Sequence, residues 1–303
     1  MKQESTNQYD EIRGGGIGFY EQKRGLIAVS GKEAVQFLNG LITNDAAKLA
    51  DHEQMSAAFP NAQGRLLAVV RVLRKGDQFL FETVAETHEK VFKNLFRFTF
   101  AGDFHVEDLS ENYRYFSTEN GNLMENGNWK TENGELIEFQ SDFGADYFVP
   151  NESAENFTSE LKNQNAVRLS DELYEVLRIE NGIPKYGVDM DETTIVPELG
   201  IAELISYQKG CYIGQEIIAR IHFRGHIAKQ LTGLILEAEA KPGDELKSLD
   251  GKNAGKLTSA TFSPKLEKHI ALAFVRYDYL AEGTELKVNE TAATVKILPF
   301  LTN

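Results

Sequence analysis

The sequence predicts a region of mixed helices and strands that is followed by an all-β region. Between Gly25 and Asn181, some stretches have apolar residues at helical spacing, and others have the short apolar or alternating runs of strands. From Gln230 onward, β-rich runs are separated by Gly, Pro and Asp turns, which is the pattern of a small barrel or sandwich. Because the 303 residues are about twice the length of a typical domain, we expect two or more domains.

The first elements are a strand and a helix. Residues 25–31 (GLIAVSG) are typical of a short buried strand. Ser30 and Glu33 have the spacing of a capping box, which predicts the start of a helix. Asn44 lies in a polar run at the end of this helix, where a short side chain either closes a turn or faces a ligand. Apolar residues support the helix between these points: Ala34, Phe37, Leu38 and Leu41.

A hairpin pattern follows the helix. A turn at 60–64 leads into a β-rich run over 66–73, and a second turn leads into a strand over 78–84. Thr87 then has the position of a helix N-cap. Further strands are predicted at 104–108, 114–117 and 147–149.

Residues 118–134 are rich in Asn, Gly and Glu and contain Trp129, so we expect a mobile surface insertion there rather than a linker between domains. Two more helices are predicted after it. Ser153 is placed to cap the first, and Ser170 is placed to cap the second, which has the sequence DELYEVLRIEN.

The composition limits the compartment and the partners. The chain has 46 acidic and 32 basic residues, which argues against a broad surface for nucleic acid or anionic membrane but not against a local basic cleft. The one cysteine excludes an intrachain disulfide and favours a reducing compartment. The polar, partly acidic N-terminus resembles no targeting segment, and no apolar run approaches the roughly 20 residues that span a bilayer. We therefore expect a cytoplasmic protein.

The stretch Tyr207–Gln230, the basic stretch, differs from the rest of this acidic chain. It holds Cys211, and Gly214 precedes a short predicted helix over 215–221. The positive end of a helix dipole stabilises an anion or a thiolate, so a ligand site is one interpretation. A buried structural cysteine in a tight turn is the other. Apart from the acid Glu216, the charged residues here are all basic: Lys209, Arg220, Arg224 and Lys229.

Four motifs give the chain a resemblance. The run KGCYIGQE, followed by Arg220 and by FRG at 223–225, resembles the signature of the YgfZ folate-binding proteins, which are relatives of the glycine cleavage T-protein, an aminomethyltransferase. The resemblance implies an α+β fold, with a folate-binding ring region over 1–226 and a C-terminal β-barrel over 227–303. The other motifs are SGKEAVQFLNGLITND at 30–45, FPNAQGRLLA at 59–68 and RIENGIPKYGVDMDE at 178–192.

The resemblance also implies a cofactor and its site residues. The cofactor would be tetrahydrofolate or a one-carbon derivative, and Glu180 would bind the amino-pyrimidinone edge of its pterin, since a carboxylate accepts two adjacent hydrogen bonds. The alternative for Glu180 is a solvated residue near a helix C-terminus. Tyr186 would line the cleft or belong to the core. Basic side chains would attract the glutamate tail: Lys209 and either Arg220 or Arg224.

One position departs from the T-protein pattern. T-proteins carry an acid needed for aminomethyl transfer just after the glycine turn that corresponds to Gly64, whereas this chain continues through Ala68 without a carboxylate. Without such a group, nothing stabilises charge or relays a proton at the reacting carbon. The cysteine of KGCYIGQE, by contrast, marks the YgfZ branch. Cys211 is therefore the candidate catalytic residue. Whether the chain is an enzyme stays open.

Three functions compete. The first, implied by the resemblance, is a folate-binding accessory protein that supports the assembly or repair of iron-sulfur enzymes, including tRNA-modifying enzymes, without itself binding nucleic acid or membrane. The second is a folate-dependent aminomethyltransferase or demethylase with its carboxylate elsewhere, at Asp45 or Asp189. The third is a zinc site made of Cys211, His222 and His226, although Phe223 to Gly225 suggest that the helix ends before His226.

Overall fold

The computed structural model describes residues 3–121, 130–131 and 134–301 and divides into two compact units. Unit 1 consists of Met1–Ala57 and Ala68–Tyr174, and unit 2 of Ala58–Leu67 and Glu175–Asn303. Each unit is thus made of two pieces of chain. The division predicted between residues 226 and 227 stays a prediction. Much of the insertion predicted at 118–134, including Trp129, lies outside the described residues.

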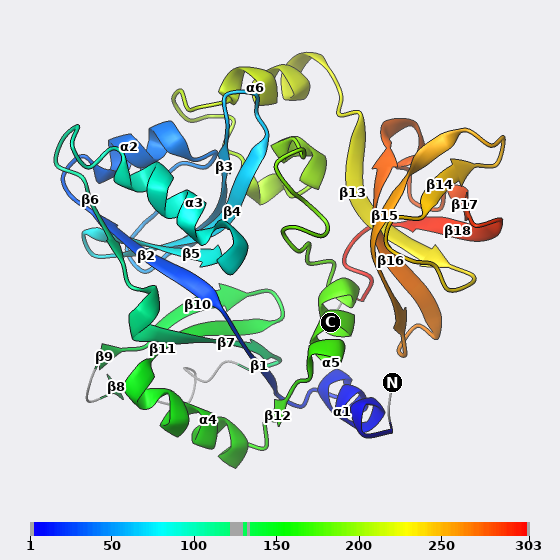
Figure 1. Ribbon diagram of the computed structural model, residues 1–303, viewed down its shortest axis with the longest axis horizontal. Helices are drawn as coiled ribbons and strands as arrows, with labels where there is room; N and C mark the ends of the chain where they lie inside the picture. Colours follow the sequence, from blue (N-terminus) through cyan, green and yellow to red (C-terminus); the bar gives the residue numbers. More distant parts are fainter. Residues whose placement is uncertain (1–2, 122–129, 132–133, 302–303) are drawn as a thin grey trace. The chain divides into compact units, whose positions relative to one another are not determined.

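Unit 1 contains two five-stranded sheets (Figure 1). In order across the first sheet, the strands are β3 (Gln54–Pro60), β4 (Leu66–Lys75), β5 (Gln78–Val84), β2 (Arg24–Ser30) and β6 (His105–Asp108). In the second they are β10 (Ile137–Ser141), β11 (Gly144–Pro150), β7 (Tyr113–Glu119), β1 (Gly18–Gln22) and β12 (Val167–Arg168). The predicted hairpin is confirmed, because β4 and β5 pair antiparallel from Val70↔Thr83 to Lys75↔Gln78.

The two sheets of unit 1 share an apolar core. Tyr115 on β7 packs with Leu26 and Leu80 of the first sheet, and the next residue, Phe116, points to the other face, where it meets Phe157. This alternation is the ordinary consequence of a pleated strand. Helix α4 (Ala154–Asn163) covers that outer face of the second sheet. Helix α3 (Ala85–Phe96) packs on β2, β5 and β6 and covers the outer face of the first.

The capping box predicted for Ser30 and Glu33 is wrong. Helix α2 (Ala34–Leu41) does follow, but neither side chain caps it. The Glu33 carboxylate instead accepts the backbone N–H of Asp103 at 2.7 Å. The carboxylate that the local pattern assigned to the N-terminus of the helix thus accepts its hydrogen bond from a distant segment instead.

The other predicted caps have mixed outcomes. Helix α3 begins before Thr87, which is buried in its first turn, so that cap is wrong. Ser153 occupies the N-cap position of α4 but makes no side-chain cap bond there. The cap at Ser170 is confirmed, because its hydroxyl accepts a backbone N–H of the first turn of α5 (Asp171–Glu180) at 3.2 Å.

Unit 2 contains a closed barrel, as the resemblance implied and in place of a sandwich. Its interior is filled by small and branched apolar side chains such as Leu257 and Val275. On the outside, Ile179 of α5 packs with Leu231, Ile270 and Phe300 and fixes the end of that helix to the barrel. In order around the barrel, the strands are β13 (Lys229–Leu236), β16 (Lys268–Arg276), β15 (Asn253–Ser263), β14 (Glu245–Ser248), β17 (Glu285–Val288) and β18 (Thr291–Lys296).

The remaining elements are short or lie outside the sheets. Helix α6 (Gln215–Arg224) is longer than the predicted helix over 215–221. In the described part of the chain, no helix is long and apolar enough to cross a membrane. The others are α1 (Gln3–Arg13), β8 (Lys130–Thr131), β9 (Gly134–Glu135), and the 3₁₀ helices η1 (Ser110–Asn112), η3 (Asn151–Ser153), η4 (Val196–Leu199), η5 (Ala202–Leu204) and η6 (Tyr277–Tyr279).

Candidate functional site

Six of the seven predicted site residues lie in unit 2, and only Asn44 lies in unit 1. In unit 1, the Asn44 side chain closes its own turn. Its Oδ1 accepts the Asp45 N–H at 2.9 Å, and its Nδ2 donates to the Ser56 carbonyl at 2.8 Å. The turn role that was one interpretation of Asn44 is confirmed, and its use toward a ligand stays a prediction.

Glu180, the last residue of α5, is fully buried. The hydroxyl of Ser263 on β15 donates to its Oε1 at 2.5 Å, and the N–H of Phe300 donates to its carbonyl oxygen at 2.9 Å. The alternative of a solvated side chain is therefore wrong. A carboxylate at a helix C-terminus faces the negative end of the dipole, and burial also disfavours its charge. This position is unfavourable for a carboxylate on both counts.

The loop after α5, residues 181–190, carries Tyr186 and Asp189. Tyr186 is 8% exposed and forms a backbone bridge with Met190, while the N–H of Gly187 donates to the Met190 carbonyl at 2.7 Å. Asp189 is fully buried, and its carboxylate accepts four hydrogen bonds. No lone pair is left for a reacting group, which argues against Asp189 as the missing catalytic carboxylate.

The KGCYIGQE stretch forms a loop before α6 in which only some side chains are accessible. Cys211 is exposed. Lys209 is 9% exposed, and its Nζ lies 5.1 Å from the centre of the Tyr212 ring, a cation–π distance. Burial, aided by the nearby Tyr207, raises the pKa of Tyr212 to about 12, so its hydroxyl stays neutral at neutral pH. The alternative of a buried cysteine is wrong.

Two of the four motifs meet in unit 2. Asn61 closes a tight turn, in which its Oδ1 accepts the N–H of Arg65 at 3.0 Å and its carbonyl accepts the N–H of Gly64 at 2.9 Å. Gly214, the N-cap of α6, packs directly on this turn. A Cβ at Gly214 would lie 2.4 Å from the Asn61 carbonyl oxygen. The FPNAQGR turn and the KGCYIGQE loop thus form one structural piece, and Gly214 permits the contact.

The cations of α6 project into solvent. Arg220 and Arg224 are exposed, and among the residues that the structure describes neither forms an ion pair. They are therefore accessible to an anionic ligand, and the binding of the folate tail by Arg220 or Arg224 stays a prediction.

The two histidines of the zinc hypothesis are engaged elsewhere. His222 stacks on Tyr207 with 3.7 Å between ring centres, and His226 lies 4.6 Å from the ring of Tyr277. Within the described ranges, no group of three or more His, Cys, Asp or Glu side chains is placed to hold a metal ion. Helix α6 ends at Arg224, before His226 as expected, although it continues beyond the predicted end at residue 221.

The structure shows what replaces an acid after the Gly64 turn. Arg65 donates from Nη1 to the Thr193 carbonyl at 2.5 Å and bridges Ile195 through its backbone. Ala68 is a fully buried residue of β4. The turn is thus fastened to residues 193–195, and this position supplies no carboxylate.

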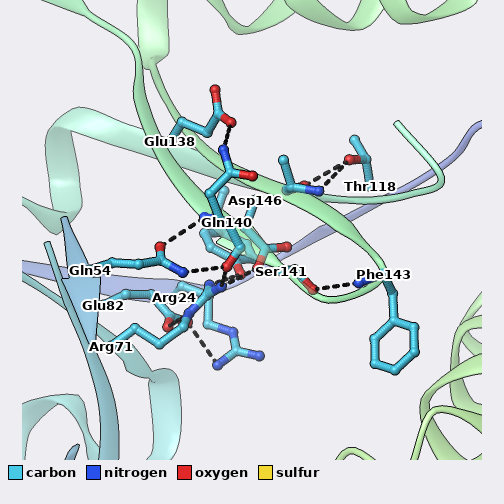
Figure 2. Close-up of polar contacts among 12 residues, drawn as sticks. Arg24, Gln54, Arg71, Glu82, Thr118, Glu138, Gln140, Ser141, Phe143 and Asp146 are labelled. Atoms are coloured by element: carbon cyan, nitrogen blue, oxygen red, sulfur yellow. Dashed lines mark hydrogen bonds and ion pairs between the residues drawn. The ribbon is translucent and has the colours of Figure 1, made fainter. Parts of the chain in front are cut away.

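Unit 1 contains a buried ionic cluster that the sequence did not predict (Figure 2). Arg71 on β4 is its centre. Its Nε lies 2.7 Å from Glu82 on β5, and its Nη1 lies 2.6 Å from Asp146 on β11 of the other sheet. Its Nη2 also donates to the hydroxyl of Tyr115 at 3.0 Å. Arg24 lies 3.0 Å from the second oxygen of Glu82, an ion pair without hydrogen-bond geometry.

The cluster connects the two sheets and is electrically balanced, with two arginines against two acids. Burial would raise the pKa of Glu82, but Arg71 and Arg24 outweigh burial and hold the pKa below its usual value. Burial and the charge of Asp146 raise the pKa of the Tyr115 hydroxyl well above its usual value, so it remains a neutral partner. We infer that the cluster holds the sheets together rather than binding a ligand.

Comparison with known proteins agrees with this fold. Residues 229–300 match the family model of the glycine cleavage T-protein C-terminal barrel domain. The chain is 26% identical to an aminomethyltransferase of Rubrobacter xylanophilus, over 91% of this chain and 80% of that protein. It is 25% identical to a chloroplastic protein of Arabidopsis thaliana that is named as a transferase, over 91% of this chain and 69% of that protein.

A solved structure shows the same architecture over nearly the whole chain. It is the glycine cleavage system aminomethyltransferase T from Bartonella henselae, which superposes with a TM-score of 0.86 at 19% identity and covers 98% of this chain and 89% of that chain. At this identity the likeness concerns the fold. The chain has the aminomethyltransferase T fold, a mixed α/β region followed by a closed six-stranded β-barrel.

Proposed function

We propose that this chain binds tetrahydrofolate or a one-carbon derivative and is an accessory protein for the assembly or repair of iron-sulfur enzymes, including those that modify tRNA. Two findings support the folate site: the aminomethyltransferase T fold, and the similarity to aminomethyltransferases over nine tenths of the chain. The iron-sulfur role comes from the resemblance of KGCYIGQE to the YgfZ signature, and the exposed thiol of Cys211 is compatible with it.

Glu180 is the observation that carries the folate proposal. Its carboxylate is fully buried at the C-terminus of α5, within the motif that resembles the pterin-binding motif of T-proteins. A carboxylate accepts two hydrogen bonds side by side, and the two adjacent N–H donors of a pterin edge match such an acceptor. Tyr186 would be the wall beside the ring. Lys209 and Arg220 or Arg224 would attract the glutamate tail.

Replacing Glu180 with glutamine should weaken tetrahydrofolate binding between about tenfold and a hundredfold, because a charged acceptor of two hydrogen bonds becomes a neutral acceptor of one. The amide oxygen still accepts from Ser263, so the fold should be retained. Isothermal titration calorimetry under anaerobic conditions measures the change. Glu239→Gln, which removes the same charge at an exposed residue between barrel strands β13 and β14, should bind like the wild type. Equal affinities for wild type and Glu180→Gln would contradict the assignment.

Aminomethyl transfer is the second candidate, favoured by the names of the relatives. The absence of a carboxylate between Gly64 and Ala68, and the enclosed state of Asp189, weigh against it. Asp45 accepts hydrogen bonds from Asn39 and from the N–H of Ala47 and belongs to its own turn. Robust folate-dependent methylene transfer by the purified protein would favour this candidate over the accessory role.

Cys211→Ala should fail to restore iron-sulfur enzyme activity in a strain from which this gene has been deleted, because the proposed role needs an accessible thiol. Cys211→Ser should fail as well. Gly210→Ala changes the neighbouring residue, where a Cβ meets no atom within 4 Å, and should restore activity. The enzyme's activity in cell extracts is the measurement. Full restoration by Cys211→Ala would remove the thiol from the proposal.

A further inference from the structure

One buried carboxylate ties the loop 181–190 to the barrel. Oδ2 of Asp189 accepts hydrogen bonds from Nη1 of Arg178 at 2.8 Å and from the backbone N–H of Lys185 at 2.9 Å. Oδ1 accepts hydrogen bonds from the hydroxyl of Thr258 at 2.5 Å and from the hydroxyl of Ser259 at 2.7 Å. Two of the four donors thus come from barrel strand β15, far along the chain.

A β-bulge makes this arrangement possible. Successive side chains of a regular strand point to opposite faces, so Thr258 and Ser259 would not normally reach one oxygen. The pairing of β15 with β16 shifts between Leu257 and Ser259, which leaves Thr258 as the extra residue. Such a bulge redirects a side chain. Here it brings two adjacent hydroxyls to the same carboxylate oxygen.

Arg178 closes the network. Its side chain is 3% exposed, and all five of its N–H groups are used. Nε and Nη2 donate to Glu175, Nη2 also donates to Ser259 at 2.9 Å, and Nη1 donates to Asp189 and to the Ile183 carbonyl. Since Ser259 accepts from Arg178 and donates to Asp189, the three side chains form a closed ring. The ring fixes both ends of the segment between Arg178 and Asp189.

We propose that Asp189, Thr258 and Ser259 are positioning residues for the pterin-binding side chains. The proposal rests on the proposed function. Glu180 and Tyr186 both lie between Arg178 and Asp189, and β15 holds the segment twice: Ser263 binds Glu180, and the bulge binds Asp189. The barrel therefore sets the spacing between the carboxylate and the tyrosine ring. Asp189 acts through this geometry and not as an acid or base.

The test removes the two hydroxyls with little change of shape, in the double variant Thr258→Val/Ser259→Ala of the full chain. Hydrogen exchange of the amides over 183–190 should become at least about tenfold faster, and tetrahydrofolate should bind about tenfold more weakly, as expected when two buried hydrogen bonds are lost. Thr258→Ser, which keeps a hydroxyl, should retain both properties. Ser248→Ala is the matched control, because this buried barrel serine bonds Asp250 and Lys252 and not Asp189.

The outcomes separate the two proposals. Unchanged exchange over 183–190, or an equal effect of Ser248→Ala, would overturn the positioning role, as would weaker binding by Glu180→Gln without weaker binding by the double variant. If the wild type does not bind tetrahydrofolate, the proposed function fails. If wild type and Glu180→Gln bind alike, the assignment of Glu180 fails while folate binding stands. In both cases the positioning of pterin-binding residues is overturned, and hydrogen exchange still shows whether the two hydroxyls hold the loop 181–190.

Discussion

Arg71→Met should lower the free energy of unfolding by about 3 kcal/mol, the low end of the range for breaking a buried ion pair. The arginine side chain is 19% exposed, but its two acidic partners are only 5% and 8% exposed. Removing Arg71 leaves Asp146 buried without this cation and leaves Glu82 with Arg24 alone. It also removes the hydrogen bond to Tyr115, one of the contacts that join the two sheets of unit 1.

Arg168→Met is the matched control for this effect. Arg168 is also a strand arginine of unit 1 that pairs with an acid, Glu21, but its side chain is 64% exposed and the pair is 3.4 Å apart. An exposed pair contributes between about 0 and 1 kcal/mol, so the control should be nearly as stable as the wild type. Urea denaturation followed by circular dichroism compares the variants. Equal stabilities of the two variants would show that the cluster contributes no more than a surface ion pair.

Gly214→Ala should destabilise unit 2 by about 2–4 kcal/mol, because it adds backbone strain and a steric clash. The residue has a φ of 82°, in the left-handed region that side chains disfavour. Its new Cβ would lie 2.4 Å from a backbone oxygen of Asn61, which has no flexible end to move away. The start of α6 and the turn at 61–64 would have to separate, and the KGCYIGQE loop, which carries Cys211, would move with them.

Gly210→Ala isolates the effect of the contact. Gly210 lies in the same loop, but a Cβ there meets nothing within 4 Å. Its stability should change by less than about 1 kcal/mol. The urea midpoint gives the stability, and hydrogen exchange of residues 61–66 reports on the turn. If Gly214→Ala is as stable as Gly210→Ala, with normal protection of the turn, the close packing of the two motifs is not required.

Local signals predicted those parts of the fold that local contacts determine. The hairpin of β4 and β5 was predicted because its strands are adjacent in the chain, and Ser170 because it bonds the first turn of its own helix. The capping box at Glu33 failed for the opposite reason. Its carboxylate bonds the N–H of Asp103, 70 residues away, and no local pattern contains that donor.

In the candidate site, too, local motifs could be recognised but contacts between distant residues could not. The motifs point to Glu180 and Cys211 as candidate site residues, but not to the contacts that hold them. Asp189 and Thr258 are 69 residues apart, and the hydroxyls reach the carboxylate through a bulge that has no sequence signature of its own. The pairing of Arg71 with Asp146 likewise depends on two sheets packing face to face. The periodicity of a strand predicts which residues are buried and not which distant charge they meet.

A crystal structure of the protein with bound tetrahydrofolate would test the central claim most directly. We expect the N–H donors of the pterin edge to lie within hydrogen-bond distance, about 2.7–3.2 Å, of the Glu180 carboxylate, with Tyr186 against the ring. The distance from the Cys211 sulfur to the pterin would show whether the thiol belongs to the same site. A pterin bound elsewhere, with Glu180 still enclosed against Ser263, would contradict the account.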